Sequence, residues 1–569
     1  MSHPASQWNK SKKPPNCHSG TSSDWINYIR DEVIGEGAAI PGPFGERPLL
    51  YADYTASGRA LGVIEETMRY QVLPFYANTH TETSYTGRAT TQLREAARQA
   101  VGDSVGANDD YAIIFAGAGA TAAINRCSQI LGLNPGVESS PQARPVVFIG
   151  PFEHHSNDLI WRECDVDLVR IPLADSGVPC LDTLARRLDE YADHEMKVAA
   201  FSAASNVTGI KTDVAALARL VHQHKGIVLL DYAASGPYVS INVAGRGEGD
   251  HLDAIFLSPH KFVGGPGSSG VLVIRKALCR NAKPSIAGGG TVSYVTANHH
   301  RYVTNIQRRE EAGTPGILGD IRAGFAFRIK DLVGAEHIEA RERELVKMAM
   351  TRWQAVSNIH LLGSLTASRL AIFSFNISAG GRDIHHNLIV AMLNDLFGIQ
   401  ARGGCSCAGP YGHELLSIDE KTAAEHEDLV QMGRSLYRPG WVRVGFNFFF
   451  SNEATNYVIS AVEFLARYAP ILMKLYSVDE HSGVWHACSQ RVPTRPANLL
   501  DTLLSQGAGH EQALLTDAED YFARAEQLVE QARALPLAVT TRSPDVPVRW
   551  FWWPHEAEQA LQAQIETTQ

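Results

Sequence analysis

Two charged side chains stand directly after predicted strands. The apolar run 227–230 ends at Asp231, and the apolar run 254–257 is followed shortly by Lys261. Because the chemistry of an open α/β sheet gathers at the carboxyl ends of its strands, we expect the carboxylate and the amine to lie close together. A lysine can form a Schiff base with an aldehyde, and a carboxylate can keep a pyridine nitrogen protonated. The pair therefore predicts a site for pyridoxal 5′-phosphate (PLP), although singly each residue could be an ordinary turn or surface residue.

A turn of small residues follows the strand predicted at 112–115. It contains Gly119, Ala120 and Thr121, and helix-favouring residues come next. Small side chains let backbone N–H groups approach an anion at a helix N-terminus, where the helix dipole also favours negative charge. The turn lacks the full dinucleotide fingerprint and the Gly-Lys-Ser/Thr ending of a nucleotide P-loop. It is thus compatible with a phosphate cradle but does not identify one alone.

The elements that must position these residues alternate between about 45 and 275. Amphipathic stretches such as 214–225 have apolar residues at helical spacing. They lie between short β-branched runs that are apolar on both faces, which indicates a mostly parallel sheet covered by helices. The strands are predicted at 112–115, 146–149, 167–171, 198–201, 227–230, 254–257 and 270–274.

The pattern changes after Gly319. Helices are predicted at 323–333 and 338–356, and strands around 370–376 and 442–446, which indicates a smaller α+β domain. Beyond about residue 470 the chain is polar and helical, with a strong amphipathic helix at 518–535. The aromatic run Trp550, Phe551, Trp552, Trp553 follows it. We expect this run to pack within the same protein or dimer, because large aromatic side chains are mostly buried; a surface for a partner is the alternative.

These changes divide the 569 residues into four parts. Residues 1–24 form a flexible, polar N-terminal arm. Residues 25–320 form a PLP-binding large domain, of which 25–45 could instead pack on the small domain. Residues 321–470 form the small α+β domain. Residues 471–569 form a helical C-terminal extension that contains the aromatic run.

The composition excludes several classes of protein. The net charge of −10 is spread along the chain, which argues against nucleic acid or an anionic membrane surface as the main partner. No window approaches the roughly 18 to 20 apolar residues of a membrane span, and the N-terminus lacks the apolar core of a secretory signal. Of the eight cysteines only Cys405 and Cys407 are close in sequence, so we expect no disulfide scaffold and a reducing, cytoplasmic setting.

Several motifs, in their order and spacing, resemble the class V aminotransferase group of fold-type I PLP enzymes, and within it the cysteine desulfurase and selenocysteine lyase branch. The resemblance covers about residues 45–465. It implies an α/β fold-type I transferase with PLP as its cofactor, assembled as an obligate homodimer. The similar segments lie at 51–57, 119–125, 153–157, 205–209, 258–261, 311–315, 400–408 and 441–445.

The resemblance also implies roles for single residues. Lys261 would carry the cofactor, Asp231 would pair with its pyridine nitrogen, His154 would cover its ring and Asn206 would bond its phenolic oxygen. Arg443, with Arg402 and Asn206, would bind the substrate, because a guanidinium suits a carboxylate. The residues implied at the phosphate are Gly119, Ala120, Thr121, Ser258, His260 and, from the other subunit, Thr314.

The loop 400–408 indicates which reaction the cofactor serves. In the resembling family it places Cys407 at the position of a nucleophile, and a thiolate there could take sulfur from L-cysteine or an analogue, leaving alanine and an enzyme persulfide. Lys261, Cys407 and His154 are then the catalytic residues, and a sulfur-acceptor protein is a partner. A small buried apolar role is the alternative for Cys407. Cys405 could relay sulfur, form a regulatory disulfide, or have no role.

Three observations leave alternatives open. Ala234 stands where the family has Gln, so the contact to the phenolic oxygen is lost or comes from Asn206 or Ser235. Thr81 stands where many desulfurases have Arg, which leaves the substrate open. Zinc bound by Cys405, Cys407 and His413 lacks a fourth local ligand, so we expect no metal. Another class V reaction (transaminase, epimerase, C–S lyase or kynureninase-like hydrolase) and a non-catalytic PLP-binding scaffold are the competing functions.

Overall fold

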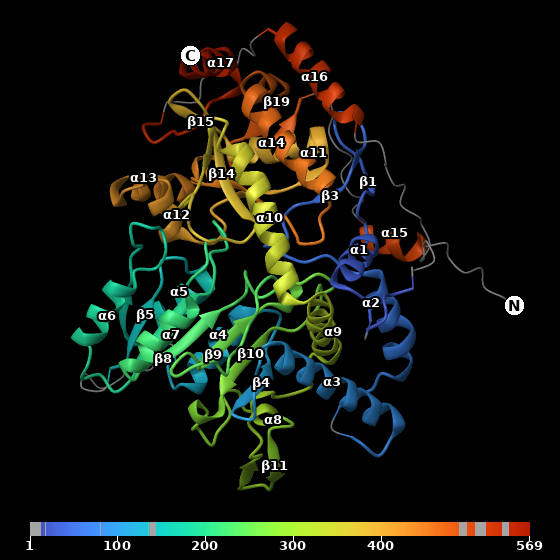
Figure 1. The fold of residues 1–569 in the computed structure, drawn as a ribbon, viewed down its shortest axis with the longest axis vertical. Coiled ribbons are helices and arrows are strands. Elements are labelled where there is room, and N and C mark those ends of the chain that lie inside the picture. The colour runs from blue at the N-terminus through green and yellow to red at the C-terminus, as the bar shows by residue number, and fades with distance from the viewer. Residues whose placement is uncertain are drawn as a thin grey trace, which may run out of the picture.

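Two sheets organise the chain, one in each half of the molecule (Figure 1). The computed structural model describes residues 13–17, 19–79, 81–134, 136, 144–488, 498–506, 519–536 and 546–568. The larger sheet and its helices fill the lower half of Figure 1, and the smaller sheet fills the upper half together with the last helices of the chain. In the described part, every helix is too short or too polar to cross a membrane.

The large sheet has seven strands and is mostly parallel, as the sequence predicts. Only β10 runs antiparallel to its neighbours, β4 and β9, whereas β9, β8, β7, β5 and β6 pair in parallel. The strand order across the sheet is β4 (Tyr111–Phe115), β10 (Val271–Arg275), β9 (Ala254–Leu257), β8 (Ile227–Asp231), β7 (Lys197–Ser202), β5 (Val146–Ile149) and β6 (Asp167–Arg170).

Both faces of this sheet are buried. Side chains alternate along β4, so that Ile113 and Phe115 join one apolar core and Ala112 and Ile114 join the other. This alternation explains why the strands are continuous apolar runs in the sequence. The helices of this half are α3 (Tyr85–Ser104), α4 (Ala120–Ile130), α5 (His155–Glu163), α6 (Leu181–Glu190), α7 (Val214–Gln223) and α8 (Ile306–Glu310), and a hairpin of β11 (Val292–Val295) and β12 (His300–Tyr302) projects from it.

The small sheet is antiparallel and has helices packed around it. Its order is β13 (Ile359–Leu361), β14 (Ile372–Ala379), β18 (Trp441–Gly445) and β17 (Arg402–Gly404), and β15 (Arg382–Ile384) also pairs with β14. Strand β17 lies at the edge of this order and, among the described residues, pairs only with β18. The accompanying helices are α10 (Ala335–Trp353), α11 (His386–Phe397), α12 (Gly409–Leu415), α13 (Glu420–Gln431) and α14 (Asn452–Leu472). Helix α9 (Ile317–Val333) packs against α3 of the other half, and its Ala323, Ala326 and Phe327 join a core of the large sheet.

The N-terminal segment is joined to the small sheet. Strand β3 (Leu50–Tyr51) pairs in parallel with β16 (Ile399–Gln400), and Asp53 forms an isolated bridge with Gly445. Helix α1 (Ser22–Glu32) begins inside the range that the sequence analysis gives to a flexible arm, and residues 1–12 of that arm lie outside the described residues. The remaining short elements are β1 (Ala39–Ile40), β2 (Arg47–Pro48) and α2 (Gly62–Thr67).

The C-terminal extension packs on the small sheet. Its helix α16 (Glu519–Ala534), predicted at 518–535, contacts α11 and α14, where Phe522 lies 5.0 Å from Phe397 between ring centroids. A hairpin of β19 (Tyr476–Asp479) and β20 (Val484–Ala487) precedes it, where the sequence analysis expects helix. Phe551 in the aromatic run is fully buried. Helices α15 (Leu499–Gln506) and α17 (Ala557–Thr568) complete the extension.

Candidate active site

A cavity of about 260 Å³ opens where the carboxyl ends of β8 and β9 face strands β17 and β18 of the small sheet. All the predicted catalytic, cofactor-binding and substrate-binding residues line it except Thr314. The lining residues are Thr55, Ala56, Gly119, Ala120, Thr121, His154, Ser156, Ser202, Ala204, Asn206, Asp231, Ala233, Ala234, Ser258, His260, Lys261, Arg402, Ser406, Cys407 and Arg443.

Lys261 and Asp231 line this cavity from neighbouring strands. Asp231 is the last residue of β8, and Lys261 closes a 3₁₀ turn after β9 that begins with Pro259. Burial lowers the pKa of Lys261 to about 8, although the nearby carboxylate of Asp231 opposes this shift. Burial also raises the pKa of Asp231, against a hydrogen bond from the Ala233 N–H at 2.8 Å. A buried carboxylate of this kind is stabilised by a cation beside it.

The turn before α4 forms an anion cradle. Gly119 caps α4 without a side-chain hydrogen bond, and the Ala120 N–H donates to Ser258 Oγ at 2.9 Å. A Cβ atom on Gly119 would lie 2.9 Å from His260 Cε1, so a larger residue here would require the imidazole to shift. The hydroxyls of Thr121 and Ser156 lie 2.7 Å apart beside the same helix N-terminus. Backbone N–H groups, hydroxyls and an imidazole at a helix N-terminus suit a phosphate.

Two polar side chains lie between the cradle and the small sheet. His154 caps α5, and its Nδ1 accepts the Ser156 N–H at 3.1 Å. Burial, together with the nearby Lys261, lowers the pKa of His154 to about 4, so the imidazole is neutral at pH 7. Asn206 donates from Nδ2 to the carbonyl of Ser406 at 2.8 Å, while its buried Oδ1 has no hydrogen-bond partner among the described residues.

Ala234 stands where the family has Gln, and Asn206 Oδ1, unpaired among the described residues, could replace the hydrogen bond that the Gln would make. Ser235, the other replacement considered, also has a buried hydroxyl without a partner in the described part, but it does not line the cavity. Asn206 does. The geometry therefore favours Asn206 for a contact with a hydroxylated ring.

Two arginines share one carboxylate at the opposite wall. Arg443 Nη2 donates to Asp53 Oδ1 at 2.8 Å, and Arg402 Nε donates to Asp53 Oδ2 at 2.9 Å. Arg402 and Arg443 are directly opposed in the β17–β18 register. Arg443 also donates to the Asn206 carbonyl at 3.0 Å. Asp53 has no role in the sequence analysis; the signal that could have found it is that a buried arginine requires a nearby anion.

The loop after β17 holds Cys407 at the mouth of the cavity. The backbone φ angles of Ser406 (52°) and Cys407 (56°) are positive, a conformation that costs side-chain-bearing residues free energy. The loop is held by the His155 N–H, which donates to the Cys407 carbonyl at 2.9 Å, and by the bond from Asn206 to Ser406. Cys407 is exposed and Cys405 is partly buried.

The donor set fits PLP. An amine with a lowered pKa, a buried carboxylate, a phosphate cradle and an unpartnered amide oxygen line one cavity, and each corresponds to one functional group of that cofactor. Thr314 lies apart from them, on the surface, where its hydroxyl accepts a long 3.5 Å hydrogen bond from Asn78 Nδ2.

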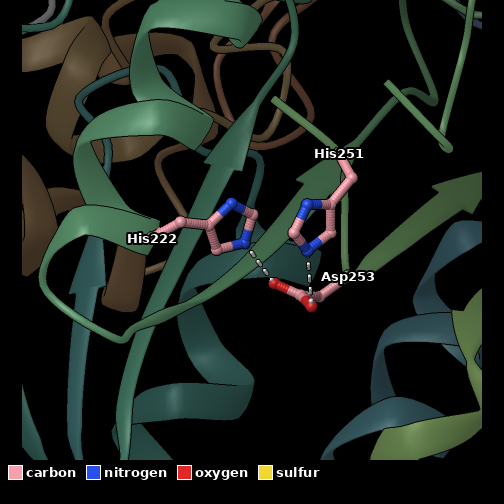
Figure 2. Close-up of side chains that lie close together, drawn as sticks. All are labelled: His222, His251 and Asp253. Atoms are coloured by element: carbon pink, nitrogen blue, oxygen red, sulfur yellow. Dashed lines mark hydrogen bonds and ion pairs between the residues drawn. The ribbon is translucent and has the colours of Figure 1, made fainter. Parts of the chain in front are cut away.

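A second cluster of polar residues lies at the other end of the strands. In the described part, the group whose side chains come close enough to share a metal is His222, His251 and Asp253, not Cys405, Cys407 and His413 (Figure 2). His222 Nε2 lies 2.8 Å from Asp253 Oδ2, and the hydrogen bond between them raises the pKa of His222 although burial opposes it. Arg275 Nη1 donates to His251 Nε2 at 2.9 Å and to Asp253 Oδ1 at 3.3 Å. The cluster therefore already contains its cation.

Comparison with known proteins gives matches over most of the chain. The family model described as aminotransferase class-V matches residues 50–453. A probable cysteine desulfurase of Halalkalibacterium halodurans is 29% identical over 370 residues, which cover 64% of this chain and 85% of that protein. A cysteine desulfurase of Escherichia coli O9:H4 is 28% identical over 389 residues, covering 68% and 90%.

Solved structures share the fold. An apo cysteine desulfurase from Thermococcus onnurineus NA1 superposes with a TM-score of 0.61 at 24% identity and covers 74% of this chain and 94% of its own. A cysteine desulfurase from Escherichia coli, solved as an S-sulfonic acid, superposes with a TM-score of 0.56 at 22% identity, covering 73% and 94%. The family match ends before the C-terminal extension begins.

Proposed function

Because this chain belongs to the class V aminotransferase family, whose members are PLP enzymes, we propose that it is a cysteine desulfurase that takes L-cysteine, releases alanine and moves the sulfur onto Cys407. One observation carries the proposal: a single cavity is lined by Lys261, by the arginine pair and by the loop with the exposed Cys407. The matches to curated cysteine desulfurases support it.

Particular residues would hold the cofactor. Lys261 would bind it covalently, the helix α4 turn with Ser258 and His260 would hold its phosphate, and Asp231 and Asn206 would bond its ring substituents. His154, neutral at pH 7, would cover the ring without adding charge. When bound, PLP supplies an electron sink for the α-carbon of an amino acid.

The chain's own residues would orient the substrate and move its proton. Arg402 and Arg443 line the cavity from adjacent strands, so a substrate carboxylate can bind the guanidinium N–H groups that Asp53 does not use. With a pKa of about 8, the Lys261 amine is close to the operating pH, which suits a general base that takes the proton of the α-carbon at Nζ.

Cys407 would take the sulfur. Its thiolate Sγ attacks the substrate sulfur, so that an S–S bond forms and the C–S bond breaks, and the electron pair of the C–S bond stays with carbon and is protonated. Cysteine and a thiol become alanine and a persulfide, and no external oxidant is needed. A sulfur-acceptor protein would then remove the terminal sulfur from this exposed loop.

We propose that the working unit is a homodimer in the cytoplasm. Thr314 lies outside the cavity of its own chain, and a patch of exposed apolar residues surrounds the start of α3, which supports coverage by a second copy. The patch consists of Tyr70, Leu73, Phe75, Tyr76 and Tyr85. All eight cysteines are free, which supports a reducing compartment.

The test of the reaction is turnover of L-cysteine by PLP-loaded protein with a thiol reductant, with sulfide and alanine measured together. We expect equal amounts of both products, lost in Lys261→Ala and in Cys407→Ser. Cys405→Ser is the matched control and should keep turnover. Cofactor binding without alanine production would contradict the desulfurase assignment, and turnover that survives Cys407→Ser would indicate a class V reaction that does not use this thiol.

The test of the dimer mixes two inactive subunits. If Thr314 serves the partner's cofactor, a hybrid of Lys261→Ala with Thr314→Ala contains one fully intact site, so mixing should restore PLP binding and turnover. If Thr314 serves its own chain, the mixture will show only the sum of the two separate variants.

A further inference from the structure

We propose that the C-terminal extension is a positioning device for the loop that carries Cys407. The extension lies outside the matched family region, and the described parts of it contact strands β14 and β15 and helix α11, which in turn contacts β17. The inference rests on the proposed function only in giving Cys407 the role of nucleophile. The contacts themselves form a continuous path from Trp550 to the glycines that precede the loop.

The path begins with an aromatic stack. The indole of Trp550 lies over the imidazoles of His385 and His386, with ring centroids 5.0 Å and 5.4 Å away and interplanar angles of 26° and 6°. From the hairpin, the Trp485 indole N–H donates to His385 Nδ1 at 3.3 Å. The fully buried Phe551 meets His385 edge to face. Two separate segments of the extension thus converge on the first turn of α11.

Backbone hydrogen bonds fix the aromatic run in register. The Asp383 N–H donates to the Trp550 carbonyl at 3.0 Å, and the Trp552 N–H donates to the Asp383 carbonyl at 3.1 Å. The Trp550 indole N–H also donates to the Tyr437 carbonyl at 3.2 Å. The run is therefore added beside β15 like a short extra strand, and Trp550 cannot slide along α11.

The path continues from α11 to the loop. A Cβ atom on Gly403 would lie 3.1 Å from His386 Cδ2 and 2.3 Å from Asn387 Oδ1, and one on Gly440 would lie 2.9 Å from His386 Cε1. The His386 ring thus rests against both β17 and the residue before β18. Asn387 Nδ2 donates to the Gly483 carbonyl at the turn of the hairpin, at 2.9 Å.

Strand β17 needs this support. It is a three-residue edge strand whose only partner in the described part of the chain is β18, and it ends in Gly403 and Gly404, which have no side chains of their own to pack. The positive φ angles of Ser406 and Cys407 persist only if the surrounding structure holds them. Packing of the extension against His386 supplies part of that constraint. The described residues of the extension do not line the cofactor cavity.

The experiment compares two tryptophans of the same run. Trp550→Ala removes the ring on the histidines, whereas Trp552→Ala removes a ring of the same size that instead donates to the Ala379 carbonyl and lies over Arg382. In PLP-loaded protein, we expect amide hydrogen exchange in residues 402–408 to accelerate at least about tenfold in Trp550→Ala but not in Trp552→Ala. The kcat should fall on the order of tenfold in Trp550→Ala, with KM for L-cysteine nearly unchanged.

A milder variant guards against misfolding of Trp550→Ala. Asn387→Ala cuts the link between the hairpin and β17 without opening a large cavity, and it should also accelerate exchange in 402–408. Equal exchange of this loop in Trp550→Ala and Trp552→Ala, or acceleration that is just as large in β14, would overturn the proposal. Exchange is measured without turnover, so failure of the desulfurase assignment would not be mistaken for failure of this one.

Discussion

The carboxylate of Asp53 accepts a hydrogen bond at 2.8 Å from Arg443, which lines the cavity where we propose that a substrate carboxylate binds. The guanidinium of Arg443 is therefore already paired with a carboxylate of the protein before a substrate binds. The position of this carboxylate follows from two pairings, of β3 with β16 and of Asp53 itself with Gly445 at the end of β18 in the small sheet. The carboxylate orients both arginines without closing the cavity.

The first prediction concerns this orientation. Asp53→Ala should raise the KM for L-cysteine about tenfold, because a hydrogen bond between charged groups contributes roughly 1.5–3 kcal/mol. Asp53→Asn keeps the shape and one acceptor, so it should recover part of the loss. Steady-state kinetics of both variants would measure this, and an Asp53→Ala enzyme with a lower KM would show that Asp53 competes with substrate more than it orients the arginines.

The second prediction concerns the arginine itself. Arg443→Lys keeps the charge but loses the planar fork that can bind a carboxylate with two N–H groups, so we expect KM to rise on the order of a hundredfold. The absorbance of the bound cofactor should stay unchanged. A matched Arg402→Lys variant should be affected less, since Arg402 is half-exposed and Arg443 is buried. Equal effects would contradict this ranking.

The third prediction concerns the pH dependence of cofactor capture. Because burial lowers the pKa of Lys261 to about 8, the neutral amine that reacts with an aldehyde increases as the pH rises through 8. The rate of PLP capture by the apoprotein should rise about tenfold from pH 7 to pH 9 and then level off. Stopped-flow absorbance would measure it. A rate that still climbs tenfold per pH unit above 9 would mean that the amine has an ordinary pKa.

The fourth prediction concerns stability in mild acid. Burial lowers the pKa of His385 to about 4, and its Nδ1 already accepts the N–H groups of Trp485 and Asn387, so a proton there would displace both. The unfolded chain binds this proton near pH 6.5, so stability falls as the pH drops from about 6.5 towards 4. We expect a loss of about 2 kcal/mol between pH 7 and pH 5 from this residue.

His385→Asn is the control for that effect, because asparagine can still cap α11 but does not titrate. Urea denaturation of both proteins at pH 7 and pH 5 gives the comparison. If the two lose the same stability on acidification, other groups are responsible.

The sequence predicts the part of the site that depends on strand ends. Asp231 and Lys261 each follow a continuous apolar run, and parallel strands bring their carboxyl ends to one edge, so their proximity needs no knowledge of the rest of the fold. The α/β class with a mostly parallel sheet follows from the same runs and is confirmed.

The sequence does not predict contacts between distant, locally weak elements. Strand β17 is short and rich in glycine, so its composition favours a loop, and only β18 makes it a strand. The β19–β20 hairpin likewise lies in a polar stretch, where its first strand shows an apolar–polar alternation of only four residues, Tyr476–Asp479. Asp53 lies in the segment 51–57 that resembles the family, but nothing in that segment predicts its pairing with two arginines far along the chain. The support of the Cys407 loop by Trp550 depends on packing that no local pattern records.

The pairing of Asp53 also sets an order of events during synthesis. Its two arginines follow it by 349 and 390 residues along the chain. Domains generally fold as they emerge, starting from the N-terminus, so the large sheet with Lys261 can form well before these partners leave the ribosome. A nascent chain would thus form the Lys261 site and the phosphate cradle first, and the arginine pair that binds the carboxylate of an amino acid last. Ribosome-bound intermediates of this protein are expected to capture the cofactor before they can select a substrate.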